Sequence, residues 1–151
     1  MYACIAPNAW LSIAAGLSLA ASLLHIGIVI RGPDWYRFFG AGEKMATAAE
    51  AGRWYPALSG LAIAGILMTW SALALAGACG WHFPGLKWLL VLISGVFIVR
   101  GLGGFPLVYL VDSPEIAEIR ARPVFVVVTG LICLGFGFCF GYGVYQVWTE
   151  L

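Results

Sequence analysis

Four long apolar stretches, separated by short segments that carry nearly all of the charge, dominate the pattern of the chain. They cover residues 9–30, 56–78, 87–111 and 123–148. Each is long enough to cross the hydrocarbon core of a bilayer, which takes about 20 residues of helix. They are apolar on all sides, whereas the strands of a membrane barrel alternate in polarity. The pattern therefore predicts four transmembrane helices.

The ends of these stretches carry residues that suit helix boundaries. Pro56 and Pro123 stand at the start of the second and fourth stretches, where the missing proline N–H costs a helix nothing. Residues 113–115 (Ser-Pro-Glu) combine an N-cap, a first-turn proline and an acid that matches the helix dipole. We therefore also expect a short helix over residues 114–121, lying along the membrane surface.

The composition indicates to which class of protein these four helices belong. Of the 151 residues, 62% are hydrophobic and 10% are charged, whereas soluble domains have about 45–50% and about 25%. These values exclude a soluble globular domain and a disordered chain. The net charge of +1, without a basic stripe, excludes a nucleic-acid partner. We expect a single transmembrane domain over residues 1–151, surrounded by lipid.

Basic residues lie mainly on one side of the predicted helices. The segments after the first and third stretches hold six of them: Arg31, Arg37, Lys44, Arg53, Arg120 and Arg122. The opposite side holds only Lys87. Because Lys and Arg tend to stay in the cytoplasm, both termini are expected to face the outside. The expected location is a bacterial inner membrane, with the termini in the periplasm.

The segment between the first and second stretches is too long for a simple connection. Residues 34–51 contain few helix breakers apart from Gly40 and Gly42, and Phe38, Phe39 and Met45 make them partly apolar. This mixture is typical of a helix that lies at the membrane surface. The predicted fold is an all-α, antiparallel four-helix transmembrane bundle with an amphipathic or re-entrant cytoplasmic segment between helices 1 and 2.

The third stretch contains the residues that are hardest to reconcile with a regular span. A charge, three glycines and a proline fall together at Arg100, Gly101, Gly103, Gly104 and Pro106. A proline inside a helix removes a hydrogen bond and crowds the preceding turn. We therefore predict a break or kink near residues 101–106, as in the discontinuous helices of transporters.

Arg100 is the first candidate site residue, because an arginine at mid-bilayer costs about 2.5–3.5 kcal/mol on insertion scales. Such a residue usually faces the interior of the protein and has a partner. Glu43 is the preferred partner, with His25 beside the pair in the cytoplasmic half. A cluster of His, Glu and Arg could bind an anionic head group, carry a proton or hold a small polar substrate.

Each candidate also has a simpler interpretation. Arg100 could reach toward the surface and pair with Asp112 or backbone carbonyls. His25 could donate a hydrogen bond to a carbonyl of its own helix. Glu43 could pair with Lys44 or Arg37. Trp70, near the middle of the second stretch, could line a cavity or fill the core.

Small residues are frequent in the first, second and fourth stretches, and Gly137 and Gly141 form a GxxxG motif. In membranes, such residues let helices approach closely. The motif could form a dimer interface or ordinary packing within one chain. Because four helices make a thin bundle, we expect a homodimer, a higher homo-oligomer or attachment to a larger membrane complex.

The cysteines and histidines limit the cofactors. Cys4 and Cys79 are both predicted outside, where a disulfide between them is possible. Cys133 and Cys139 lie six residues apart in the fourth stretch, on different sides of a helix. The alternative is that all four are small buried hydrophobic residues. With His25 as the only histidine in a span, the sequence predicts no haem, no metal site and no other cofactor.

The run Phe38–Ala51 (FFGAGEKMATAAEA), together with the later pair Arg100 and Gly101, resembles a pattern in small four-span bacterial inner-membrane proteins of unknown activity. The resemblance implies the four-helix membrane fold. It also favours Glu43 and Arg100 as a pair.

Three function classes remain. The first is transport or conduction of a small polar or ionic solute through a site formed by Arg100, Glu43, His25 and Trp70. The second is an accessory or lipid-binding subunit of a larger complex. The third is a membrane-embedded enzyme acting on a lipid or quinone, with His25 or Glu43 as general base. The sequence favours a protein that is not an enzyme.

Overall fold

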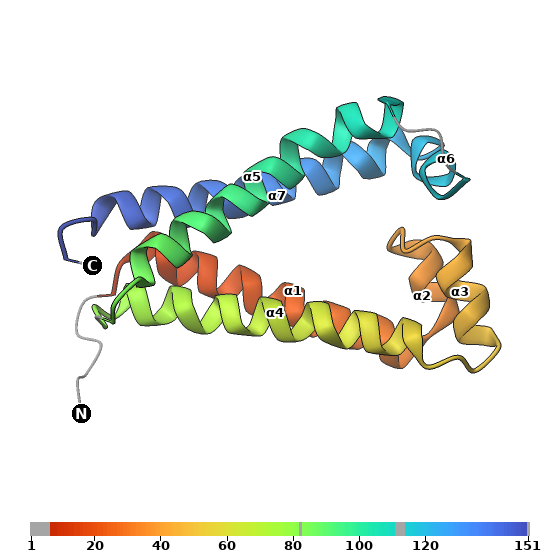
Figure 1. Ribbon diagram of the computed structural model, residues 1–151, viewed down its shortest axis with the longest axis horizontal. Coiled ribbons are helices and arrows are strands. Elements are labelled where there is room, and N and C mark those ends of the chain that lie inside the picture. Colours follow the sequence, from red (N-terminus) through yellow and green to blue (C-terminus); the bar gives the residue numbers. More distant parts are fainter. Residues whose placement is uncertain (1–6, 82, 111–113, 151) are drawn as a thin grey trace.

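A computed structural model describes residues 7–81, 83–110 and 114–150, and this part of the chain is all-helical (Figure 1). The helices in order are α1 (Ala9–Arg31), α2 (Pro33–Phe38), α3 (Glu43–Glu50), α4 (Tyr55–Ala78), α5 (Leu86–Leu110), α6 (Pro114–Arg120) and α7 (Pro123–Gln146). Cys4, Asp112 and Ser113 lie outside the described residues.

The four long helices α1, α4, α5 and α7 confirm the predicted apolar spans. Each contains a segment that is long and apolar enough to cross a membrane, which makes this a membrane protein by length and composition. Their ends lie within two residues of the predicted ones. The short helix expected over residues 114–121 is also present as α6.

The segment between the first two spans forms two short helices, α2 and α3, in place of one. Gly40 and Gly42 separate them, with φ angles of 74° and 90°. Side chains other than glycine rarely adopt such angles, so the chain turns here rather than continuing as a helix. The turn brings α3 back against α2. Tyr36 and Ala46 are buried there with Ile28 of α1, in a small apolar cluster.

Helices α1 and α4 pack against each other through small residues. The Ser22 hydroxyl donates to the carbonyl of Ala64 at 2.8 Å, and the Ser71 hydroxyl donates to the carbonyl of Ala15 at 2.8 Å. A Cβ at Gly60 would lie only 2.5 Å from a methyl group of Val29. Such close approach is how helices associate where lipid provides no hydrophobic drive.

Helices α5 and α7 form a second pair of the same kind. The Ser94 hydroxyl of α5 donates to the carbonyl of Gly137 at 2.7 Å. A Cβ at Gly137 would lie 2.7 Å from Ile98 Cγ1, and one at Gly141 would lie 2.9 Å from Ser94 Oγ. The GxxxG motif of α7 is therefore occupied by α5 of the same chain.

Within α5, residues 101–106 are helical, and the helix runs without interruption from Leu86 to Leu110 with Pro106 inside it. The predicted break is therefore wrong. The glycine at position 101 serves close packing instead, because a Cβ there would lie 2.9 Å from the carbonyl oxygen of Gly130 and 2.7 Å from Leu134 Cγ on α7. The predicted kink stays a prediction.

The two helix pairs meet at one end and diverge toward the other (Figure 1). At the end near the chain termini, an apolar core joins them. Residues from all four long helices build this core, among them Leu11, Ala74, Phe97 and Phe140. At the opposite end, the α5/α7 pair separates from the α1/α4 pair, and the short helices α2, α3 and α6 lie there. We call this the open end.

Candidate functional site

Arg100 lies just beyond the apolar core, in the direction in which the two helix pairs diverge. Among the side chains of α5 that the structure describes, Phe97, three residues before Arg100, is the last one in the core, and its ring centroid lies 5.2 Å from that of Trp70 of α4. Because residues three apart lie on neighbouring positions of a helix face, Arg100 is placed beside the face that meets α4. Arg100 is exposed, and it makes no ion pair within the described part of the chain.

Glu43 pairs with Arg37, not with Arg100. Glu43 Oε1 lies 2.7 Å from Arg37 Nη2, and Arg37 Nε also donates to the carboxylate. The pairing predicted with Arg100 is therefore wrong, and the alternative with Arg37 is confirmed. The physical reason is the turn between α2 and α3, which returns Glu43 to the last turn of α2.

Arg37 is the centre of a small ionic network at the open end. Its guanidinium lies 2.8 Å from Glu50 and 3.7 Å from Asp34, in addition to Glu43. The hydrogen bond from Arg37 lowers the pKa of Glu43, and the two glutamates raise the pKa of Arg37. The charge of Arg37 is thus compensated by carboxylates of its own helix α2 and of the neighbouring helix α3.

The other two predicted site residues are engaged with their neighbours. His25 Nδ1 lies 2.8 Å from the carbonyl of Ala21 one turn earlier, so this nitrogen donates a hydrogen bond to its own helix. The ring of Trp70 packs against the core beside Phe97. Contacts in the described residues therefore bring Trp70 close to the Arg100 side of α5, but they join neither His25 nor Glu43 to it.

The described cysteines differ in their bonding state. Cys133 and Cys139 are free thiols in α7. Cys79 is disulfide-bonded. Because Cys4 lies outside the described residues, the Cys4–Cys79 bridge stays a prediction.

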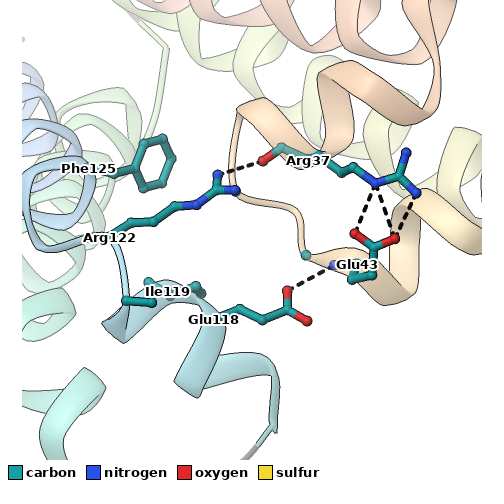
Figure 2. Close-up of a pocket in the computed structure, with 9 residues that line it drawn as sticks. Arg37, Glu43, Glu118, Ile119, Arg122 and Phe125 are labelled. Atoms are coloured by element: carbon teal, nitrogen blue, oxygen red, sulfur yellow. Dashed lines mark hydrogen bonds and ion pairs between the residues drawn. The ribbon is translucent and has the colours of Figure 1, made fainter.

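A pocket of about 400 Å³ lies at the open end, between the α2–α3 turn and the start of α7 (Figure 2). Two hydrogen bonds cross at its edge. Glu118 of α6 accepts from the backbone N–H of Glu43 at 2.9 Å, and Arg122 donates to the carbonyl of Arg37 at 2.8 Å. The lining residues are Arg37, Gly40, Gly42, Glu43, Glu118, Ile119, Ala121, Arg122 and Phe125.

Among the described residues, Glu118 and Arg122 are the charged groups of this pocket that form no ion pair. Each binds only a backbone group across the pocket edge, whereas Arg37 and Glu43 neutralise each other. Phe125 closes the apolar side of the pocket, since its ring approaches Gly40 so closely that a Cβ there would lie 2.6 Å away.

The sequence argument missed this site. It used Arg122 only to orient the chain and did not single out Glu118. The available signal was their place in the chain, because Glu118 and Arg122 are charged residues in the short segment directly before the fourth apolar stretch. Nothing in the sequence connected them with Glu43, which is 75 residues from Glu118.

Two further observations bear on the site. Among the described residues, no group of three His, Cys, Asp or Glu side chains could hold a metal ion. Known protein families, curated proteins and solved structures contain no match to the chain. The functional argument therefore rests on the geometry of the molecule.

Proposed function

We propose that this protein binds an anionic amphiphile, a carboxylate or phosphate attached to an apolar chain, at Arg100 between its two helix pairs. The observation that carries the proposal is Arg100 itself. It is an exposed cation on a membrane-spanning helix, without an acidic partner in the described residues. An anion from outside the protein would supply the missing partner.

Because Arg100 lies deep in the membrane, an anionic partner would lower the free-energy cost of its charge. Ten residues separate Arg100 from Leu110 at the end of α5, which is about 15 Å of helix at 1.5 Å per residue. A charged side chain so far from the helix end is costly in hydrocarbon, by about 2.5–3.5 kcal/mol on insertion scales. A hydrogen bond to a charged group contributes about 1.5–3 kcal/mol, so one bound anion could offset this cost.

The surroundings of Arg100 favour a ligand with an apolar part. Val99 and Leu102, on either side of it in the chain, are 70% and 61% exposed. A small inorganic anion would leave that apolar surface to lipid, whereas an acyl chain would cover it. The exposed neighbours therefore support an amphiphile.

Binding is favoured over conduction through the protein. On the side of Arg100 nearer the termini, Phe97 of α5 packs with Phe136 and Phe140 of α7, with ring centroids 4.8 and 5.9 Å away, and with Trp70 of α4 at 5.2 Å. These rings belong to the apolar core that joins the two helix pairs. This packing supports access from the open end alone. From the sequence, we expected transport or conduction of a small polar or ionic solute. In its place, we propose binding of an amphiphilic anion.

The proposal includes the orientation inferred from the basic residues. In a bacterial inner membrane, the four long helices would cross as an antiparallel bundle with both termini in the periplasm. The open end, which carries Arg31, Arg37 and Arg122, would then face the cytoplasm. An anionic amphiphile would enter from the cytoplasmic leaflet.

The test compares two ligands that differ only in charge. Oleate and oleyl alcohol share one chain, and their binding to the protein in zwitterionic nanodiscs is measured by equilibrium partitioning. We expect oleate to bind at least about tenfold more tightly, equivalent to about 1.4 kcal/mol. Arg100→Gln should remove this preference, and Arg100→Lys should keep part of it.

The matched control is Arg53→Gln, because Arg53 is an exposed arginine in the loop between α3 and α4. This variant should bind oleate as the wild-type protein does. Equal binding of the acid and the alcohol by the wild-type protein would overturn the proposal, and so would an unchanged preference in Arg100→Gln.

A further inference from the structure

We propose that the pocket at the open end binds the phosphoethanolamine head group of a membrane lipid, with Arg122 on the phosphate and Glu118 on the ammonium group. This site is separate from Arg100, and the argument for it does not depend on the proposed function. It rests on the charges, the spacing and the position of the residues that line the pocket (Figure 2).

The charges of the pocket favour a zwitterion over an anion or a cation. Four charged residues line it, two arginines and two glutamates. Arg37 and Glu43 are paired with each other at 2.7 Å, which leaves Arg122 and Glu118 as one cation and one anion. A ligand carrying a single charge would satisfy one of these groups and leave the other without a partner.

Both groups retain hydrogen-bonding capacity. Arg122 uses Nη1 to reach the carbonyl of Arg37, and a guanidinium has five N–H donors in all. Glu118 uses Oε2 to accept the backbone N–H of Glu43, and a carboxylate has a second oxygen. The free donors of Arg122 suit the planar recognition of a phosphate, and the free oxygen of Glu118 suits an ammonium donor.

The spacing fits a short zwitterion. Glu118 and Arg122 reach the same segment across the pocket edge, Glu118 at the backbone N–H of Glu43 and Arg122 at the carbonyl of Arg37 (Figure 2). In phosphoethanolamine, only two carbons separate the phosphate ester oxygen from the ammonium group, so one head group can reach both side chains. The pocket of about 400 Å³ is within the range of sites that hold small molecules.

The position of the pocket points to a lipid as the source of the head group. Arg122 immediately precedes α7, whose apolar span begins at Pro123. Phe125, in the first turn of that span, lines the same pocket. A head group between Arg122 and Glu118 would therefore have its acyl chains beside α7, at the boundary where lipid head groups lie.

The first measurement uses the wild-type protein alone. Nanodiscs are prepared with equal amounts of phosphatidylethanolamine, phosphatidylcholine and phosphatidylglycerol of the same chain composition, and the lipids that stay bound are counted by native mass spectrometry. We expect phosphatidylethanolamine to be retained at least fivefold over phosphatidylcholine, roughly 1 kcal/mol. The choline head group has no N–H to donate, and glycerol has no cation.

Two substitutions then assign the contacts. Glu118→Gln keeps an oxygen that accepts the N–H of Glu43 but loses the charge, so it should abolish the preference for ethanolamine over choline. Arg122→Gln should lower retention of both zwitterionic lipids. Arg53→Gln, which lies outside the pocket lining, should leave the retention pattern unchanged.

Three results would overturn the proposal. Equal retention of the ethanolamine and choline lipids would remove the ammonium contact, and preferential retention of phosphatidylglycerol that Arg122→Gln abolishes would show that the pocket is an anion site. Displacement of the bound lipid by millimolar soluble phosphoethanolamine would show that the site serves a soluble compound and not a lipid. Because the first comparison needs no variant, it holds even if a substitution impairs folding.

Discussion

Replacing Gly101 with alanine tests whether α5 packs closely against α7 at this glycine. In the structure, a Cβ at this position would lie 2.7 Å from Leu134 Cγ and 2.9 Å from the carbonyl oxygen of Gly130. Carbon atoms in contact normally lie about 3.5–4.0 Å apart. The side chain of Leu134 can rotate, but the backbone oxygen of Gly130 cannot, so the two helices would have to separate.

The magnitude follows from two opposing effects. Overpacking a close interface costs about 1–3 kcal/mol. Alanine favours the helix over glycine by about 0.8–1.0 kcal/mol. For Gly101→Ala, we therefore expect a net loss of up to about 2 kcal/mol in the free energy of unfolding, with the two helices moved apart near Gly130.

The same helix offers a matched control. No heavy atom lies within 4 Å of a Cβ built at Gly95, so Gly95→Ala should be neutral or slightly stabilising. Reversible unfolding in mixed detergent micelles, followed by circular dichroism, measures both variants against the wild-type protein. Equal stability of Gly101→Ala and Gly95→Ala would refute the packing of α5 on α7 described above.

Three further outcomes follow from the contacts. Ser94→Ala removes the 2.7 Å hydrogen bond to Gly137 and should destabilise the protein by about 0.5–1.5 kcal/mol in the same unfolding assay. Arg37 lowers the pKa of Glu43, so their pairing should stabilise above the ordinary glutamate range and be lost as pH falls through the lowered pKa. Arg37→Gln should therefore move the carboxyl titration of Glu43, followed by NMR, to higher pH. In thermal melts, Arg37→Gln and Glu43→Gln should be non-additive, whereas Arg100→Gln and Glu43→Gln should add.

The four spans could be predicted from sequence because the decisive property is local. Residues 123–148 carry no charge and are mostly apolar, and α7 runs from Pro123 to Gln146. The prolines at 56 and 123 fall in the first turn of their helices, as expected. Length and hydropathy settle whether such a helix exists without any knowledge of its neighbours.

The partner of Glu43 could not be predicted in the same way. It depends on two left-handed glycines, Gly40 and Gly42, that fold α3 back on α2. A helix running through these residues would have carried Glu43 away from Arg37. The sequence suggested Arg100 because an arginine in a span needs a partner, but that need does not say which acid is near.

Gly101 illustrates a different difficulty. Glycine and proline near each other in a span are compatible with a break and with close helix packing, and both use the absence of a Cβ. Only the position of α7 decides between them, since Gly130 faces Gly101 there. The pocket could not be predicted for a similar reason, because it brings together Glu43 and Glu118, which are 75 residues apart in the sequence.

The most direct test of the central claim is to locate a bound amphiphile in crystals grown from a lipidic mesophase that contains dibromostearate. Anomalous scattering from bromine marks the chain, and the electron density marks the carboxylate. We predict a carboxylate within hydrogen-bonding distance of Arg100, with bromine between the two helix pairs, and neither feature in Arg100→Gln. Bromine confined to the outer faces, or Arg100 paired with an acid of its own chain, would contradict the account.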